Sequence, residues 1–185
     1  MSHIPNHAKK MFSGVIFDTY QWEQTMFDGS TATFEMLKRM STVSILATTK
    51  ENTILLAHQQ QPHHDDFISL PGGKQDPGET PLQTAKRELQ EESGYTSNEW
   101  ALYKSYKPYN KIDWEVFVYI AKNCTKTHPQ QLDPGEKISI STVSFEEFIE
   151  TVTVTSNFHG HEIVEDILRM KLGYKDIAHF KKQLF

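Results

Sequence analysis

Pro71 to Tyr95 reads PGGKQDPGETPLQTAKRELQEESGY, and this stretch decides how the rest of the 185-residue chain is interpreted. It is a glycine-rich turn followed by a segment that predicts a short helix. Thr80 is a suitable N-cap, and Gln83 three residues later can complete a capping box. Gly94 can adopt the left-handed conformation that commonly ends a helix. We therefore expect a helix between Thr80 and Gly94.

The expected helix has two different faces. Apolar residues at helical spacing predict a buried stripe made of Leu82, Ala85 and Leu89. Three acids lie on the adjoining stripe, namely Glu88, Glu91 and Glu92. Like charges three and four residues apart destabilise an exposed helix by a few tenths of a kcal/mol per pair. Two of these acids also stand in the last turn, where the helix dipole disfavours negative charge.

This acidic face indicates either a cation site or a solvated surface. Arg87 can pair with Glu91 one turn later, but one cation cannot neutralise three acids. Carboxylate oxygens are the ligands that Mg²⁺ prefers. Gly72 and Gly73 would let the backbone approach a metal-bound phosphate without a Cβ in the way. The glycine turn therefore favours the cation site.

These residues together resemble the signature of the Nudix hydrolases. The spacing G-x5-E-x7-R-E-U-x-E-E-x-G-U is matched by Gly73, Glu79, Arg87, Glu88, Leu89, Glu91, Glu92 and Gly94, with Tyr95 where the family usually has an aliphatic residue. The resemblance implies an α/β protein with the Nudix fold, a mixed β-sheet sandwiched between helices. With the flanking strands, the likeness extends over about residues 40 to 152.

The resemblance also implies a reaction and assigns roles by position. Family members use Mg²⁺, with Mn²⁺ as an alternative, to hydrolyse a nucleoside diphosphate linked to another moiety. The products are a nucleoside monophosphate and a phosphorylated compound. By position, Glu88 and Glu92 are expected to be metal ligands, and Glu91 either a third ligand or a partner of Arg87. The carbonyl of Gly72 could complete the metal site, and the same resemblance gives Glu79 the task of orienting Arg87.

The general base is a separate question, because family members take it either from the helix or from a later loop. The sequence Asp133-Pro134-Gly135-Glu136 is an acidic loop that follows the central strands, so Glu136 is the candidate from a loop. The alternative is an ordinary acid in a turn. The expected catalytic residues are thus Glu88, Glu91, Glu136 and Arg87.

The leading hairpin, the signature and the later acidic loop together resemble the ADP-ribose pyrophosphatase and nucleotide-sugar hydrolase branch, whose members exchange that hairpin within a dimer and use it to cover the base. A homodimer is therefore expected, with Trp22, Phe27 or Phe34 either stacking on a base or lying in the dimer core. Gly73 is expected beside the substrate. The branch commonly has an arginine where this chain reads QQQ at residues 59–61, and PAG where it reads PGG. ADP-ribose and a nucleotide sugar such as GDP-mannose both remain candidate substrates.

Composition restricts the other functions. A formal net charge of -5 and a pI near 6.0 argue against a broad nucleic-acid-binding surface. No run approaches the roughly 18 apolar residues of a membrane span. The single cysteine, Cys124, excludes an intrachain disulfide and is expected at a surface or strand end, which together with the polar N-terminus indicates a cytoplasmic protein.

We expect one domain, residues 1–185, in three parts: an N-terminal hairpin (12–39), a Nudix core (40–152) and a C-terminal helical extension (153–185). Strands are predicted at 42–48, 53–58, 67–70, 100–107, 114–121 and 137–143, and helices after Ser144 and at 161–172 and 174–184. Residues 59–66 are predicted to be a polar loop. Its His63, His64, Asp65 and Asp66 are expected to be solvated, and the histidines at 159 and 161 lack HExxH spacing.

One function of another class stays open at this point. A nucleotide-binding sensor or regulatory module could keep the fold and lose turnover. Such a module is expected to have lost acids of the signature, and all of them are present here. The sequence therefore favours an enzyme.

Overall fold

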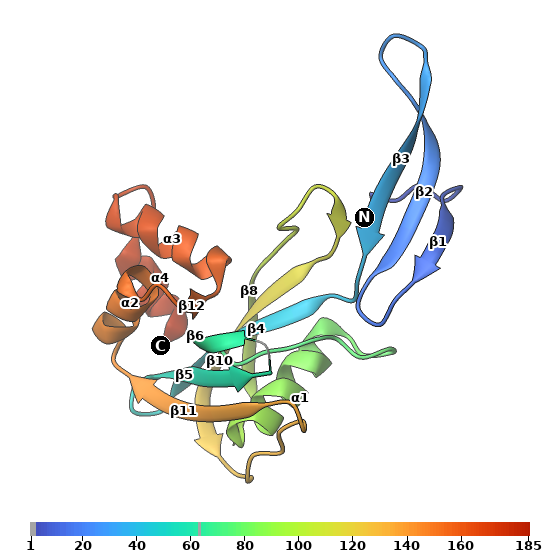
Figure 1. Ribbon diagram of the computed structural model, residues 1–185. Helices are drawn as coiled ribbons and strands as arrows, with labels where there is room; N and C mark the ends of the chain where they lie inside the picture. Colours follow the sequence, from blue (N-terminus) through green and yellow to red (C-terminus); the bar gives the residue numbers. More distant parts are fainter. Residues whose placement is uncertain (1–2, 63) are drawn as a thin grey trace.

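The computed structural model describes residues 3–62 and 64–185 (Figure 1). Within these residues the elements are, in chain order, β1 (Lys9–Ser13), β2 (Asp18–Thr25), β3 (Thr31–Lys38), β4 (Thr42–Thr49), β5 (Ile54–Gln61), β6 (His64–Ser69), α1 (Pro81–Ser93), β7 (Tyr95–Thr96), β8 (Glu99–Tyr106), β9 (Ile112–Asp113), β10 (Val116–Lys126), β11 (Lys137–Val143), α2 (Phe145–Val154), β12 (Phe158–His159), α3 (His161–Lys171) and α4 (Ile177–Leu184).

The central sheet is mixed, as predicted. Its strand order is β12-β6-β5-β4-β10-β7, with β11 also paired to β5 and β8 to β10. Strands β4 and β10 run parallel, with Ile45 opposite Tyr119, whereas β5 runs antiparallel to β6 and β11. Buried residues dominate β4 because both faces of the sheet are covered.

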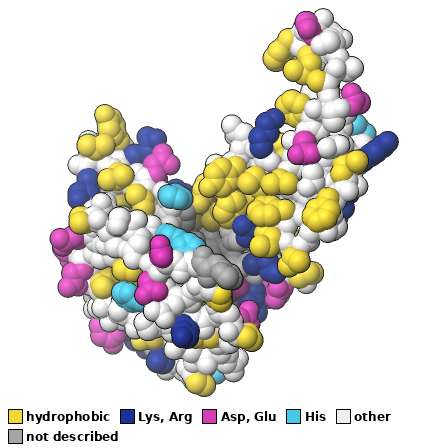
Figure 2. Space-filling view, in the orientation of Figure 1, with side chains coloured by type: hydrophobic (Ala, Val, Ile, Leu, Met, Phe, Trp, Pro, Cys, Tyr) yellow, Lys and Arg dark blue, Asp and Glu magenta, His cyan; other side chains and the backbone are white. Residues whose placement is uncertain are grey.

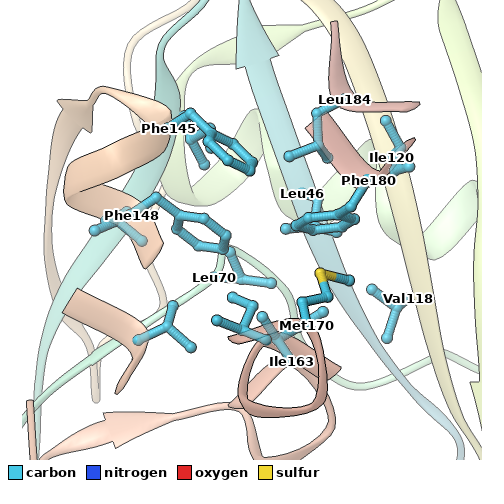
Figure 3. Packing of buried hydrophobic residues seen from close by; sticks show 14 of the residues in the cluster. Leu46, Leu70, Val118, Ile120, Phe145, Phe148, Ile163, Met170, Phe180 and Leu184 are labelled. Atoms are coloured by element: carbon cyan, nitrogen blue, oxygen red, sulfur yellow. The ribbon is translucent and has the colours of Figure 1, made fainter. Parts of the chain in front are cut away.

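Helices cover this sheet on both faces, and two hydrophobic clusters result. Neighbouring residues of a strand point to opposite faces, so Ile45 packs towards α1 with Leu89, whereas Leu46 packs in the other cluster with Phe148 and Phe180. Figure 3 shows the second cluster, in which aromatic rings of α2 and α4 meet the sheet. The predicted sandwich of a mixed sheet between helices is confirmed.

The C-terminal helices are fixed to the sheet by polar contacts as well. Asp166 of α3 is buried and accepts hydrogen bonds from Lys104 at 2.8 Å and Tyr103 at 3.0 Å, both in β8. Lys175 also donates to this carboxylate. Although burial opposes ionisation, the two lysines and the tyrosine hold the pKa of Asp166 below its ordinary value. The helical extension is thus joined to the core by charge pairing and apolar packing.

The N-terminal sheet projects away from the body of the molecule (Figure 1). Its strand order is β1-β2-β3-β9, so it contains the predicted hairpin and the short strand β9 of the core. Residues 15–17 lie inside the predicted hairpin (12–39) but belong to no strand. The N–H of Gly14 donates to the carbonyl of Phe17 at 2.9 Å, which makes a turn there, and β1 precedes it. The local turn outweighed the β-propensity of Val15 and Ile16.

Residues 59–66 are not the predicted polar loop. Strand β5 continues to Gln61 and β6 begins at His64. The side chain of Gln59 is only 6% exposed and donates a hydrogen bond to Ser69 at 2.8 Å. Backbone pairing of β5 with β6 and β11 therefore overrides the polarity of the glutamines.

The described residues of the histidine-rich segment pack against aromatic rings. The ring of His64 packs edge-on against Phe67 and His159, with centroids 5.0 Å apart in each case. His63, one of the four residues considered as ligands, lies outside the described residues. In the described chain, no three His, Cys, Asp or Glu side chains already form a metal-binding group.

Cys124 stands near the end of β10 but is buried, so a surface position for it was wrong. Burial raises the pKa of its thiol to about 12, and the thiol is therefore protonated at neutral pH. Across residues 3–62 and 64–185, no helix has both the length and the apolar character needed to cross a bilayer.

Candidate active site

Helix α1 carries the signature acids and has the predicted ends. The N–H of Thr80 donates to the side chain of Gln83 at 2.8 Å, and the N–H of Gln83 donates back to the Thr80 hydroxyl at 3.3 Å. At the other end, Gly94 has φ of 74° and its N–H donates to the carbonyl of Gln90 at 2.8 Å. The capping box and the left-handed C-cap are confirmed, so the sequence alone defines the limits of this helix.

The glycine turn (residues 71–75) lies along the edge of β4. The N–H of Ile45 donates to the carbonyl of Pro71 at 2.8 Å, and the N–H of Val43 donates to that of Gly73 at 2.9 Å. The intervening carbonyl, of Gly72, accepts no hydrogen bond from the described part of the chain. A carbonyl oxygen at Gly72 is thus free to accept a further contact.

Only glycine suits position 72. Its φ is 153°, and a Cβ built there would lie 2.2 Å from the carbonyl oxygen of Val43. Because that oxygen belongs to the backbone of a buried strand, it cannot move aside cheaply. Close packing of the turn on β4 therefore requires this glycine.

Glu92 joins the end of α1 to the glycine turn. The N–H of Gly72 donates to Oε2 of Glu92 at 2.8 Å, and the glutamate is 4% exposed. Burial raises the pKa of Glu92 well above its ordinary value, and this hydrogen bond only partly opposes the shift. Repulsion from Glu88 and Glu136 adds to it. A buried carboxylate in this position calls for a positive charge beside it.

Glu88 lies against the other glycine of the turn. A Cβ built on Gly73 would be 2.5 Å from Oε1 of Glu88. Burial raises the pKa of Glu88 to about 7; Arg87 opposes the shift, whereas Glu91 and Glu136 reinforce it. The absence of a side chain at Gly73 therefore leaves the space in which the Glu88 carboxylate lies.

Arg87 holds three of the signature glutamates. Its Nε donates to Glu79 at 2.9 Å, and one terminal nitrogen donates to both Glu88 and Glu91 at 2.9 Å. A further bond at 3.1 Å reaches the carbonyl of Lys74 in the glycine turn. The hydrogen bond from Arg87 lowers the pKa of Glu79 to about 2. The arginine thus orients the acids and fixes the turn to the helix, with Glu91 in the expected position as its partner.

These groups surround a cavity of about 280 Å³, here named the acidic pocket, which is lined by Gly73, Lys74, Asp76, Arg87, Glu88, Glu91, Glu92, Gln131, Asp133 and Glu136. Six carboxylates therefore face two cations. This donor set of carboxylates and a free backbone carbonyl suits a hard divalent cation that keeps several waters. Glu88 and Glu92 are bonded to Arg87 and Gly72 respectively, and their carboxylates would turn towards such an ion.

The acidic loop (residues 133–136) reaches the pocket because the chain before it is tied to the end of α1. The N–H of Thr127 donates to the carbonyl of Gly94 at 2.9 Å, and that of Gln131 donates to the carbonyl of Glu91 at 2.8 Å. Burial raises the pKa of Glu136, and neighbouring acids add to the rise. Sequence reasoning missed Asp76 and Asp133 as pocket residues. The position of Asp133 depends on these loop contacts, and that of Asp76 on its contacts with Glu79 and Arg87. Neither set of contacts leaves a signal in the spacing of residues.

Two of the expected substrate-binding residues, Trp22 and Phe27, do not line the acidic pocket of their own chain. Trp22 is 8% exposed, packs on Phe34 with ring centroids 5.5 Å apart and donates its indole N–H to Gln24 at 3.0 Å. Phe27 is fully exposed, next to the turn that joins β2 and β3. Neither lines the acidic pocket of its own chain, whereas Gly73 does.

Comparison with known proteins agrees with this geometry. A family model described as NUDIX domain matches residues 38–161. The chain is 29% identical over 147 residues to ADP-ribose pyrophosphatase of Bacillus subtilis (strain 168), and 28% identical over 149 residues to methanol dehydrogenase activator of Bacillus methanolicus. Each alignment covers 78% of this chain and 80% of the relative.

The solved structure of an ADP compounds hydrolase superposes on this chain with a TM-score of 0.72. The superposition covers 92% of this chain and 94% of the other, at 15% identity, and so supports the fold. The glycine turn, the arginine that holds three glutamates and the matched family model lead to one conclusion. The chain belongs to the Nudix hydrolase family, and it resembles the ADP-ribose pyrophosphatase branch of that family.

Proposed function

We propose that this hydrolase is a Mg²⁺-dependent pyrophosphohydrolase, able to use Mn²⁺ in place of Mg²⁺, that cleaves a nucleoside diphosphate linked to a sugar. The observation that carries the proposal is the excess of carboxylates in the acidic pocket, where burial raises the pKa of Glu88 and Glu92. Groups that resist ionisation when alone become good ligands once a divalent cation is bound beside them.

Glu88, Glu92 and the carbonyl of Gly72 would hold the cation. When bound, it would offset negative charge on the phosphate oxygens and promote ionisation of a water. Arg87 keeps Glu91 and Glu88 in place. Glu136 accepts the proton from the attacking water, because its raised pKa suits a base that works near neutral pH. Gly73 leaves room for a phosphate next to Glu88.

The name of the Bacillus subtilis relative supports ADP-ribose as the first substrate to test. GDP-mannose is the second candidate, because glutamines occupy positions 59–61, where the branch commonly has an arginine. The test is incubation of the purified chain and Mg²⁺ with ADP-ribose, GDP-mannose, UDP-glucose, NADH and diadenosine polyphosphates. Release of a nucleoside monophosphate is followed by chromatography. Turnover of one compound supports the proposal, and turnover of none, with nucleotide still bound, would instead assign the non-catalytic sensor role.

We further propose that the enzyme is a homodimer formed through its N-terminal sheet. Exposed apolar residues gather on this part of the chain, namely Met11, Phe12, Val15, Ile16, Met26 and Phe27. Figure 2 shows apolar side chains on the projecting arm and at its base. An exposed patch of this kind commonly marks an interface. Analytical ultracentrifugation should give a dimer, and a monomer at all concentrations would reject this arrangement.

A cytoplasmic location is also proposed, and it is supported by the single thiol. Cys124 is free, and the protein therefore has no need of an oxidising compartment. The proposed ligand is a small nucleotide, because a net charge of -5 does not favour a nucleic-acid surface.

A further inference from the structure

The connection between β10 and β11 carries the acidic loop, and the end of α1 holds it by hydrogen bonds (Figure 1). The last four carbonyls of an α-helix have no partner inside the helix. In α1 the carbonyl of Glu91 accepts from the N–H of Gln131 at 2.8 Å. The carbonyl of the C-cap, Gly94, accepts from the N–H of Thr127 at 2.9 Å. Residues 127–131 therefore complete the C-terminal end of α1.

The side chain of Gln130 makes a further connection, which also reaches β11. Its Nε2 donates to the carbonyl of Glu92 in α1, and to the carbonyl of Ile138 in β11 at 3.0 Å. Carbonyl oxygens only accept hydrogen bonds, so the nitrogen of the carboxamide must face them, and its two N–H groups match the two acceptors. We call this pair of hydrogen bonds the Gln130 bridge.

The Gln130 bridge joins the backbone positions that carry two acids of the pocket. On one side it holds the carbonyl of Glu92, whose own carboxylate accepts from the N–H of Gly72. On the other side it holds buried Ile138, which stands two residues after Glu136. Glu92 and Glu136 both line the acidic pocket. The bridge therefore fixes the start of β11, and the acid before it, against the end of α1.

Glu136 depends on an anchor of this kind, because its own turn does not connect it to α1. Its N–H donates to the carbonyl of Asp133 at 2.9 Å, and its Oε2 accepts from the N–H of Asp133 at 3.4 Å. These bonds fix the shape of the turn but not its place relative to the helix. Asp133 and Glu91 repel the ionised Glu136 side chain. The Gln130 bridge opposes this repulsion, since it joins α1 to β11 directly.

We propose that Gln130 is the positioning residue for the proposed catalytic base, because the Gln130 bridge keeps β11 against α1 and so makes Glu136 face the signature acids of the pocket. The inference rests on the proposed function, in which Glu136 accepts the proton of the attacking water. Within the described chain, Gln130 is not among the residues that line the acidic pocket, so its effect reaches the reaction through Glu136. Misplacing a reacting group by about 1 Å can cost about a hundredfold in rate.

Steady-state kinetics of Gln130→Met, on the substrate that the wild type hydrolyses best, test the proposal. Methionine has a similar length and no N–H donor, so it removes the bridge without shortening the side chain. The value of kcat should fall about tenfold to a hundredfold, while KM stays at the wild-type value. The matched control is Gln183→Met, a change of an exposed glutamine in α4, which should keep the wild-type kcat. Thermal melts verify that each variant is folded.

A double-mutant cycle with Glu136→Gln separates positioning from a general structural role. If Gln130 acts through Glu136, Gln130→Met lowers kcat no further once Glu136→Gln is present. The same loss in both backgrounds would overturn the proposal, and so would a wild-type kcat in Gln130→Met. A wild-type kcat in Glu136→Gln would overturn it as well and leave the hydrolase function intact, because no base would then need positioning.

Hydrogen exchange of the metal-free chain gives a measurement that needs no turnover. Amides of residues 131–137 should exchange about tenfold faster in Gln130→Met than in the wild type and in Gln183→Met. Unchanged exchange in this segment would overturn the bridge. If the wild type hydrolyses none of the test compounds while exchange is faster in Gln130→Met, the proposed function fails and the bridge between α1 and β11 stands.

Discussion

The N–H of Gly72 donates to Oε2 of Glu92 at 2.8 Å, which connects the glycine turn to the last turn of α1. The same turn is hydrogen-bonded to β4 on its other side. The glycine turn, α1 and β4 therefore act together to hold the carboxylate of Glu92 in a buried position. That arrangement can be tested by changing its parts one at a time.

Alanine at the glycines should separate folding from activity. Gly72→Ala should destabilise the fold by about 1–3 kcal/mol, because the new Cβ meets the Val43 carbonyl and φ is 153°. Gly73→Ala should cost less stability but strongly reduce kcat, because its Cβ would displace the Glu88 carboxylate. Gly135→Ala is the control, since its Cβ would meet nothing within 4 Å. Thermal melts and steady-state rates check this, and equal stability of the first two variants would contradict it.

Arg87→Met should lower both stability and activity. The change leaves Glu79, Glu88 and Glu91 without their shared donor, and each lost bond to a charged group costs about 1.5–3 kcal/mol before relaxation. The double variant with Glu79→Gln should be less destabilised than the sum of the two single changes, because the partners interact directly. Urea unfolding measures this coupling. Strict additivity would show that the network has no energetic role.

The metal-free protein should become less stable as pH rises from about 4.5 to about 7. The pKa of Glu88 is near 4.5 when unfolded and about 7 when folded, so the folded state binds the proton more tightly. Its contribution is complete below the unfolded pKa and is lost as pH passes the folded value, by on the order of 3 kcal/mol at most. Unfolding in EDTA at several pH values checks the direction. If the free energy of unfolding of the wild type rises with pH over this interval, and rises equally in Glu88→Gln, the prediction is contradicted.

Added Mg²⁺ should reverse that loss above pH 7. A ligand at about 100 times its dissociation constant stabilises the folded state by about 2.7 kcal/mol. The shift in the melting temperature should be larger at pH 8 than at pH 5, because the ligands must be deprotonated. Protein free of both Ca²⁺ and Mg²⁺ gives the baseline melting temperature at each pH. The same shift at both pH values would show that the cation binds elsewhere.

Sequence predicted the part of the site that local rules determine. Short-range geometry determines the cap at Thr80, the helix end at Gly94 and the spacing of the acids. Geometry of this kind can be predicted from a single sequence. It could not predict that Trp22 is buried or that Gln59 lies in a sheet, because both depend on which strands pair. Asp133 was missed for a similar reason. Its position is set by a loop tied to the carbonyls of α1 and the C-cap.

The most direct test of the acidic pocket compares Glu92→Gln with the wild type and with Glu150→Gln, an exposed acid of α2, on the substrate that the wild type hydrolyses best. Mg²⁺-dependent release of the nucleoside monophosphate should fall about 100-fold or more in Glu92→Gln and stay at the wild-type level in Glu150→Gln. The metal-free Glu92→Gln protein should melt no lower than its metal-free parent, since a repelled buried charge is removed. Wild-type turnover by Glu92→Gln would contradict the assignment of the acidic pocket as the catalytic site.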